Sequence, residues 1–520
     1  MKQIDTSTYN FPEIIANDFL YIDKTSYVWR LIQKQKGEYF LSRPRRFGKS
    51  LLVSTLKAVF QGRRELFKGL AIDKMAYDWK TYPVIHLNFG ACMASTPAEL
   101  SDYLLLRLQE CADEYKLTLR QGIPQERFIE LIKALSKNVQ VVVLVDEYDK
   151  PILSNIANQS VSDILRLLKG FYSVIKTYEG FIRFAFITGV SKFAHVSLFS
   201  DLNNLTDITL QPDYSEMLGF TEADIRRDFA DRLLEAAEKN NLSQEGLMEK
   251  LLTWYDGYRF SDADTHVCNP VSIAKFFGEG YRFANYWENT GTPSFLLELA
   301  RERNYDYETA LNDFYDESVF AAYELDRLEV TGLLWQTGYL TIKEVVRDED
   351  GMLYRLDFPD KEVQATFNQH LIEFFAGNDR SREAWSLARR FRTAIRQDDL
   401  DGFMRLFQAF LASISYDLHL NHEKFYQTIF FVVFKLLGAS IEAESQTNQG
   451  RIDAYIRTSQ RIYIFEFKLN KTAETAISQI IDRRYYEMFC QSGLPISLIG
   501  VNFNSTKGQI DNWAETTLSR

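Results

Sequence analysis

Short apolar runs alternate with longer amphipathic stretches from about residue 20 to residue 215. The runs that predict strands are residues 39–42, 84–89, 141–146, 184–188 and 207–210. They are almost continuously apolar, and patterns typical of helices separate them, most clearly over residues 98–137. Strands of this kind form parallel sheets that helices bury on both faces. The pattern therefore predicts an α/β fold with a parallel sheet in the first part of the chain.

The pattern changes twice along the rest of the chain. Residues 216–400 read as mostly helical, with a β-like piece around GYLTIKEVV and MLYRLDFP. From residue 401 the order is helix, strand, hairpin, strand and helix, which predicts a second α/β domain. We therefore predict three domains, at residues 1–215, 216–400 and 401–520.

The stretch LSRPRRFGKS, at residues 41–50, joins the first predicted strand to a predicted helix and is close to a phosphate-binding loop. Such a loop has glycine, four free positions, then Gly-Lys-Ser/Thr. Gly48, Lys49 and Ser50 match, whereas Arg43 stands at the first glycine. Lys49 is expected on the β- and γ-phosphates and Ser50 on Mg²⁺. Alternatively, the loop is a basic segment that caps a helix. The residues expected to contact nucleotide are Arg45, Arg46, Phe47, Gly48, Lys49, Ser50 and Leu51.

Polar residues follow two other predicted strands at their carboxyl ends. VVVLVDEYDK places Asp146 and Glu147 after an apolar run. Asp146 is expected to hold Mg²⁺, and Glu147 to polarise the attacking water. The alternative is a buried strand that simply ends in surface acids. Thr188 and Ser191, in TGVSKF, are positioned either to sense the γ-phosphate or to cap a strand. No guanine-reading N-K-x-D motif is evident, so the acids favour ATP hydrolysis.

The segment GRIDAYIRTSQRIYIFEFKLN carries a second set of candidate residues. Alternate residues of a strand share a face, so Glu466 and Lys468 point the same way. A turn at RTSQR is expected to bring Asp453 beside them. Asp453 and Glu466 can then bind Mg²⁺, and Lys468 can orient water or stabilise a charged phosphate. The alternative is an ordinary cross-strand ion pair, worth only ~0.2–1 kcal/mol.

Residues on the flanking predicted helices extend this second site. Glu423 is a further candidate metal ligand, and Gln479 a candidate polar active-site residue. The alternative for both residues is an ordinary helix side chain that faces solvent. Arg483 and Arg484 are candidates to contact a phosphate backbone. Tyr485 and Tyr486 are candidates to stack on its bases.

Several stretches together resemble the AAA-ATPase-like family, whose bacterial members commonly carry a C-terminal PD-(D/E)XK nuclease-superfamily domain. The stretches are YIDKTSYVWRLI, FLSRPRRFGKSLLVSTL, VVVLVDEYDKPI, FITGVSKF, DLNNLTDITL, WYDGYRF and NYWENTGTPSFL. They run in order through most of the chain, and the loop without its first glycine itself resembles that family's loop. Asp453, Glu466 and Lys468 resemble the nuclease superfamily's signature. The resemblance implies a P-loop ATPase-like domain that binds ATP, a lid or winged-helix-like region, and a nuclease-like domain.

Composition limits the partners of the chain. A hydrophobic share of 46% over 520 residues indicates large cores, and the formal net charge of −11 argues against a surface that coats nucleic acid throughout. A local basic groove is still compatible with this charge. The N-terminus lacks an apolar signal region, and the longest apolar runs are too short for a membrane span. Cysteines without C-x-x-C pairing fit reduced thiols. We therefore expect a cytoplasmic protein without a membrane partner.

Three functions are open. The first is an ATPase, using ATP and Mg²⁺, coupled to a metal-dependent nuclease-like domain that acts on nucleic acid, DNA in preference to RNA. The second is a non-catalytic ATP-dependent switch whose nuclease-like domain only binds nucleic acid or a protein partner. The third is an interaction protein with both sites inert, which the intact Lys49, Asp146 and Glu466 oppose. The sequence also leaves open whether identical chains associate into a homo-oligomer.

Overall fold

The structure is a computed structural model. It describes the chain apart from residues 157, 193–204, 288–295, 298, 301–304, 306–309, 312, 322–328, 350, 377–388, 392, 414–439, 444–445, 448–449, 452, 508 and 519–520. The chain forms two compact units, one of Met1–Gly291 with Phe314–Val363 and one of Thr292–Asp313 with Gln364–Arg520. The division into three domains at the boundaries given above stays a prediction.

A five-stranded parallel sheet lies at the centre of the first unit. Its strands are β1 (Gly37–Ser42), β2 (Val84–Asn88), β3 (Val141–Asp146), β4 (Ile182–Gly189) and β5 (Thr206–Asp207). Their order is β2-β3-β4-β1-β5, and all neighbours run parallel. β4 therefore lies between β1, which precedes the loop, and β3, which ends in the acids. The predicted parallel sheet is confirmed, and each predicted strand run overlaps one of these strands.

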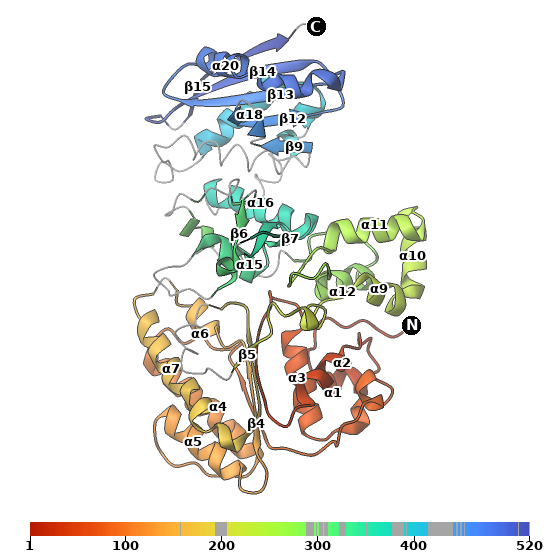
Figure 1. Cartoon of the computed structure of the whole chain (residues 1–520), viewed down its shortest axis with the longest axis vertical. Helices are drawn as coiled ribbons and strands as arrows, with labels where there is room; N and C mark the ends of the chain where they lie inside the picture. The colour runs from red at the N-terminus through yellow and green to blue at the C-terminus, as the bar shows by residue number, and fades with distance from the viewer. Residues whose placement is uncertain are drawn as a thin grey trace. The chain divides into compact units, whose positions relative to one another are not determined.

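Helices cover both faces of this sheet. They are α1 (Phe11–Ala16), α2 (Thr25–Ile32), α3 (Lys49–Phe60), α4 (Pro97–Glu114), α5 (Pro124–Leu135), α6 (Lys150–Leu153) and α7 (Val161–Thr177). α1, α2 and α3 lie on one side, and α4, α5 and α7 on the other (Figure 1). α4 begins where Thr96 caps the Glu99 backbone N–H, with Pro97 in the first turn. Its buried leucines, Leu100, Leu104 and Leu108, recur every four residues and so form one apolar face.

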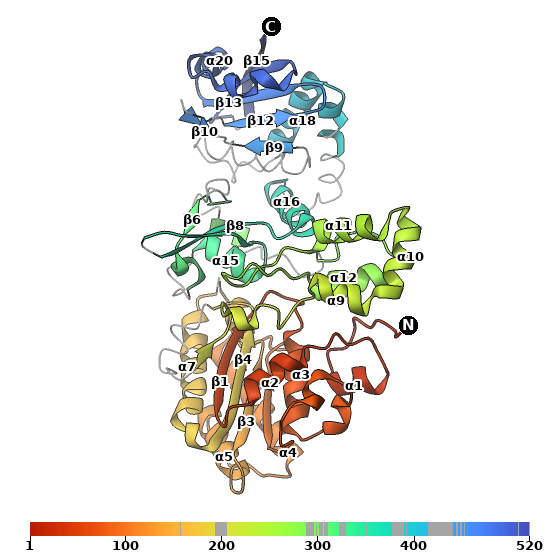
Figure 2. The same cartoon turned by 45° about the vertical axis from the view of Figure 1, so that its right-hand side comes forward.

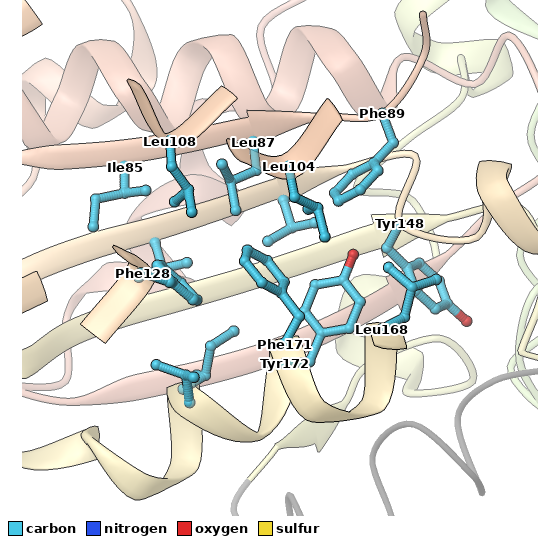
Figure 3. Close-up of a cluster of buried hydrophobic side chains, with 14 of the residues drawn as sticks. Ile85, Leu87, Phe89, Leu104, Leu108, Phe128, Tyr148, Leu168, Phe171 and Tyr172 are labelled. Carbon is cyan, nitrogen blue, oxygen red and sulfur yellow. The ribbon is translucent and has the colours of Figure 1, made fainter. Parts of the chain in front are cut away.

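Figure 3 shows the core between the sheet and these helices. Leu104 and Leu108 of α4 pack there with Ile85 and Leu87 of β2. The rings of Phe128 in α5 and Phe171 in α7 stack with their centroids 4.8 Å apart. Each of these side chains is buried, and full burial of such a side chain is worth ~1.5–3 kcal/mol. This core makes the sheet a rigid platform for the loops at its carboxyl edge.

The first unit also contains a mostly helical part, residues 216–291 and 314–363, called here the middle module. Its helices are α9 (Glu222–Asp228), α10 (Ala230–Asn240), α11 (Gln244–Tyr255), α12 (Pro270–Gly278) and α15 (Val330–Thr337). α9 to α12 lie together in Figure 2. An antiparallel sheet, ordered β6-β8-β7, consists of β6 (Phe314–Tyr315), β7 (Thr341–Arg347) and β8 (Met352–Asp357). The predicted helical pattern with one β-like piece is confirmed.

The second unit contains a mixed sheet in the order β15-β14-β13-β12-β9. The strands are β9 (Ser440–Ala443), β12 (Ala454–Arg457), β13 (Ile462–Leu469), β14 (Ile496–Asn504) and β15 (Gln509–Leu518). The short β10 (Gln446–Thr447) and β11 (Gly450–Arg451) form a separate pair. β13 and β14 run parallel with α20 (Ala473–Asp482) between them in sequence, and the other neighbours are antiparallel. The remaining helices are α16 (Lys361–Ala376), of which the unit contains all but the start, and α18 (Leu400–Ser413).

The two faces of this mixed sheet have different coverings. Phe465 approaches Phe403 of α18, with ring centroids 6.5 Å apart, and Phe407 of α18 approaches Phe503 at 6.4 Å. Glu466, next to Phe465, points to the opposite face because side chains alternate along a strand. The alternation of FEFK thus separates an aromatic face from a charged one. No helix in the described part of the chain is long and apolar enough to cross a membrane.

Candidate functional site

The loop between β1 and α3 carries the residues predicted to bind nucleotide. Gly48 caps the N-terminus of α3 with φ 88°, and Arg46 has φ 64°. Arg43 is not among the described residues with positive φ. Only glycine adopts such angles without steric cost. Glycine is therefore favoured at position 48, whereas position 43 accepts arginine.

Lys49 is the buried cation of this loop. It is 6% exposed, and its Nζ donates hydrogen bonds to the carbonyl oxygens of Arg43, at 2.9 Å, and Pro44, at 2.8 Å. Burial lowers the pKa of Lys49 to about 8, and nearby carboxylates, Asp146 first among them, oppose the shift. The ammonium is thus bonded to neutral carbonyls beside a cluster of acids.

Asp146 ends β3 and lies beside this lysine. It accepts a hydrogen bond from the Ser50 hydroxyl, and burial raises its pKa while Ser50 and Lys49 oppose that rise. Its Oδ1 atom is buried and has no hydrogen-bond partner within the described residues. A buried carboxylate oxygen of this kind costs free energy unless a donor or cation satisfies it. Together with the Ser50 hydroxyl it has the hard oxygen donors that Mg²⁺ prefers, so these residues fit the metal.

A cavity of about 610 Å³ opens beside the loop, within the usual range for small-molecule sites. All seven predicted loop residues, 45–51, line it together with Glu147. The N-terminal residues 4–9 and the middle-module residues 217–220 complete part of its wall. Asp146 and Thr188 are not among the residues that line it.

Glu147 follows β3 in a left-handed conformation, with φ 52°. A non-glycine residue in this region carries backbone strain, and such strain clusters at functional sites. Its carboxylate would be 3.4 Å from a Cβ atom placed on Gly90, so it approaches the backbone that follows β2. The position directly after Asp146, with the side chain on the cavity wall, fits the predicted role.

The Thr188 side chain makes a hydrogen bond of the kind predicted for a residue that caps a strand. Its hydroxyl donates to the Leu41 carbonyl oxygen of β1 at 2.8 Å, and the side chain is fully buried. The Ser191 hydroxyl donates to the Asp149 carboxylate at 2.7 Å. Both hydroxyls therefore hold the sheet edge together, and a role for Thr188 in sensing phosphate stays an untested prediction.

Sequence reasoning missed Asp149, which is 1% exposed and lines the cavity. Its carboxylate accepts hydrogen bonds from the backbone N–H groups of Val190, at 3.0 Å, and Ser191, at 2.7 Å. A Cβ atom on Gly189 would clash with the same carboxylate, which explains the glycine there. Asp149 thus fixes the end of β4 against the segment after β3. The last acid of D-E-Y-D was the only sequence signal for it.

In the second unit, the structure brings Asp453, Glu466 and Lys468 together. Ala454 pairs with Phe465 across the β12–β13 hairpin, so one step further Asp453 lies opposite Glu466. Asp453 Oδ2 accepts the Phe467 backbone N–H at 2.8 Å. Lys468 Nζ and Glu466 Oε1 are 2.8 Å apart, and both side chains are buried. The predicted turn is present, because the Thr458 N–H donates to the Arg461 carbonyl oxygen at 2.9 Å.

Gln479 lies on the helix that covers this charged face. Gly500 of β14 pairs with Glu466, and a Cβ atom on Gly500 would clash with the backbone of α20, so α20 packs directly on that face. The Gln479 side chain forms a hydrogen bond with Tyr485. Burial raises the pKa of Tyr485, and the carboxylates of Glu466 and Asp453 add to the rise. Tyr485 is therefore a neighbour of all three predicted residues.

The expectation that Tyr485 is available to stack on bases is wrong. It is 3% exposed and belongs to the apolar cluster of Tyr455 and Phe489, beneath α20. Arg484 forms an ion pair with Glu487. Its backbone turn, with φ 53°, separates α20 from the 3-10 helix that carries Tyr485 into the core.

The predicted metal ligand Glu423 lies outside the described residues. Within the described part of the chain, no group of three or more His, Cys, Asp or Glu side chains is arranged to hold a metal ion. In the described part of the chain, this site therefore consists of two carboxylates, Asp453 and Glu466, with one lysine.

Comparison with known proteins matches an N-terminal and a C-terminal region of the chain to families. A family model described as "Predicted AAA-ATPase" matches residues 6–199. A model of the PD-(D/E)XK nuclease superfamily matches residues 421–513. An uncharacterized protein in the vnfD 5′ region of Azotobacter chroococcum mcd 1 is 36% identical over 505 residues, which cover 94% of each chain.

Proposed function

We infer the function from the family of the chain, which belongs to the predicted AAA-ATPases in its N-terminal region and to the PD-(D/E)XK nuclease superfamily in its C-terminal domain. The chain binds and hydrolyses ATP with Mg²⁺, and couples this cycle to a metal-dependent, nuclease-like site that acts on nucleic acid. It works in the cytoplasm.

The single observation that carries the ATPase half is the buried Oδ1 of Asp146, which lies beside Ser50 and Lys49 and has no hydrogen-bond partner among the residues that the structure describes. A bound Mg²⁺ ion supplies positive charge there for the phosphate oxygens. Lys49 binds the β- and γ-phosphates, and the backbone N–H groups at the start of α3 orient them. Glu147 holds the attacking water and withdraws its proton. The 610 Å³ cavity has room for the rest of the nucleotide.

The nuclease-like half rests on the shared face of Asp453, Glu466 and Lys468. Asp453 and Glu466 are the residues that would hold Mg²⁺, and the ion would supply positive charge for the phosphodiester oxygens. Lys468 then stabilises the charge that develops on the scissile phosphate, and Gln479 orients the site through Tyr485. This chemistry suits any phosphodiester backbone, and we favour DNA.

One experiment tests both halves. Purified full-length protein is incubated with ATP, with Mg²⁺ or Mn²⁺, and with a panel of single- and double-stranded DNA and RNA. We expect phosphate release and ATP-stimulated cleavage of at least one substrate. Absence of ATP binding and of phosphate release contradicts the ATPase half, and absence of cleavage across the panel contradicts the nuclease half.

The 2.8 Å ion pair between Lys468 and Glu466 favours a second candidate function. A lysine that neutralises a buried glutamate is typical of a structural cluster as well as of an active site. In this case ATP switches the chain between states, and the C-terminal domain binds nucleic acid or a protein partner without cutting it. Nucleic-acid binding that ATP alters, without cleavage under Mg²⁺ or Mn²⁺, distinguishes this function from the first.

A further inference from the structure

The side chain of Arg43 leaves the phosphate loop and binds the body of the first unit. The residue is 1% exposed, and its guanidinium donates to the carbonyl oxygens of Thr209, at 2.7 Å, and Tyr214, at 3.3 Å. The guanidinium carbon also lies 4.1 Å from the centroid of the Phe260 ring in the middle module. A buried cation held by carbonyls and a ring face is a fixed anchor. Arg43 is therefore built into the tertiary structure and is more than a tolerated replacement for glycine.

Three neighbouring loop residues contact the middle module as well. Arg46 donates to the Tyr286 carbonyl oxygen at 3.1 Å. The Phe47 ring meets the Tyr258 ring edge to face, with centroids 4.7 Å apart. Pro44 packs so closely on Gly338 that a Cβ atom there would lie 2.6 Å from the proline. The loop is thus enclosed by the module on the side away from the sheet.

The contacted parts of the module are linked to one another. The Tyr258 hydroxyl donates to the Gly338 carbonyl oxygen at 3.0 Å, and the Arg259 N–H donates to the Thr341 hydroxyl at 2.7 Å. A displacement at the loop therefore reaches both the 258–260 segment and the end of α15.

The backbone of the same loop residues holds Lys49, the proposed phosphate-binding lysine. Lys49 donates to the carbonyl oxygens of Arg43 and Pro44, the two residues whose side chains contact Phe260 and Gly338. A nucleotide bound at the proposed site would offer Lys49 phosphate oxygens in place of these carbonyls. The peptide unit of Arg43 and Pro44 would then lose its ammonium donor, and its two side chains would be free to shift with it.

We propose that Arg43 is a positioning residue that couples occupancy of the nucleotide site to the conformation of the middle module. The inference rests on the proposed binding of ATP. Arg43 stands where other phosphate loops have glycine. In this chain, that position links the loop to the middle module. Coupling of this kind is reciprocal, so a change at the module side also alters the affinity for ATP.

The test compares the full-length protein with Arg43→Gly, which restores the complete Gly-x-x-x-x-Gly-Lys-Ser signature. Hydrogen–deuterium exchange of peptides covering residues 255–262 and 333–341 is measured without nucleotide and with a non-hydrolysable ATP analogue plus Mg²⁺. In the parent we expect the analogue to change exchange in both peptides by about fivefold. In Arg43→Gly we expect calorimetry to detect analogue binding, while the change in exchange largely disappears.

Arg30→Ala is the matched control, because Arg30 also donates to a backbone carbonyl of this region, that of Asp213, from outside the loop. It should keep the full exchange response. Phe260→Leu serves if Arg43→Gly does not fold, since it removes only the ring beneath the guanidinium. It should reduce the exchange response and alter the affinity for the analogue.

The outcomes separate the two proposals. A parent that does not bind the analogue overturns the proposed function and this inference with it. Binding with no change of exchange in the parent, or with an undiminished change in Arg43→Gly or Phe260→Leu, overturns the inference alone.

Discussion

The N-terminal and C-terminal candidate sites each place one buried lysine beside carboxylates, but the two lysines have different partners. Lys49 donates to the backbone carbonyls of its own loop, and Asp146 keeps a buried oxygen without a partner in the described residues. Lys468 is instead paired with Glu466 at 2.8 Å. The first lysine can move to an anionic ligand without leaving a carboxylate unpaired. The second can do so only if a cation takes its place beside Glu466.

This difference indicates which site is prepared for a ligand. Charges taken out of water are costly unless they are paired. In the described residues, the N-terminal site has one carboxylate oxygen of Asp146 without a partner, and Lys49 is bonded to neutral carbonyls, which suits Mg²⁺ and phosphate together. In the C-terminal site, Lys468 pairs directly with the Glu466 carboxylate. We therefore expect any cleavage there to depend on a metal ion that takes the place of this lysine beside Glu466.

The largest expected effect is at the C-terminal site. Asp453→Ala removes one of the two carboxylates that would hold the metal, so it should abolish metal-dependent cleavage while the thermal unfolding of the domain stays close to that of the parent. A nuclease assay with Mn²⁺ titration measures this. Asp482→Ala, an exposed acid on α20, is the control, and cleavage by Asp453→Ala at the parental rate would favour the ion-pair alternative.

Glu147→Gln should reduce ATP turnover by ~10²–10⁴-fold, because an amide cannot act as a general base. The affinity for ATP should be retained, since the amide keeps the shape of the side chain. Steady-state phosphate release and calorimetry check the two parts. Parental turnover would remove Glu147 from this role.

Lys49→Ala should weaken ATP binding by about 10- to 100-fold, since hydrogen bonds from a charged donor are worth ~1.5–3 kcal/mol. Lys57→Ala, a second lysine of α3, should bind ATP as the parent does. Calorimetry compares the three proteins, and equal affinity in all of them contradicts the loop assignment.

The pH dependence of ATP affinity should follow Lys49. Burial lowers its pKa to about 8, and the charged form binds phosphate. The site is therefore competent below pH 8, and affinity should fall as pH rises through about 8, by up to about tenfold per pH unit. Binding measured from pH 6.5 to 9.5 tests this, and a flat profile across that range contradicts it.

The smallest expected effect concerns Thr188. Thr188→Val removes the hydroxyl that donates to Leu41 and should cost ~0.5–1.5 kcal/mol in the free energy of unfolding. If the hydroxyl only caps the strand, turnover should stay within about twofold of the parent. A large loss of turnover with unchanged ATP affinity would instead support the phosphate-sensing role.

Local patterns were sufficient for the fold class and for much of both sites. Apolar runs of strand length gave the parallel sheet because a strand buried on both faces needs apolar side chains throughout. The loop was recognisable because Gly48, Lys49 and Ser50 are adjacent in sequence. Period-two alternation correctly placed Glu466 and Lys468 on one face of β13.

Other features were not accessible from such patterns. In the sequence, Asp149 resembles any acid after a strand. Only the structure shows that the backbone N–H groups of Val190 and Ser191, directly after β4, donate to it. Tyr485 resembles an exposed aromatic beside arginines until the chain turns at Arg484 and buries it. In each case the deciding partner lies on another element, and local periodicity carries no information about it.

The order of apolar runs and the spacing of motif residues indicated the class of the fold and the candidate residues of both sites, because strand burial and motif spacing depend on neighbours in sequence. The role of Arg43 was decided only by tertiary structure. Its carbonyl partner Thr209 lies 166 positions along the chain, and Phe260 belongs to another module. A missing glycine is visible in the sequence, but the contacts that replace it form only when the loop, the sheet edge and the middle module pack together.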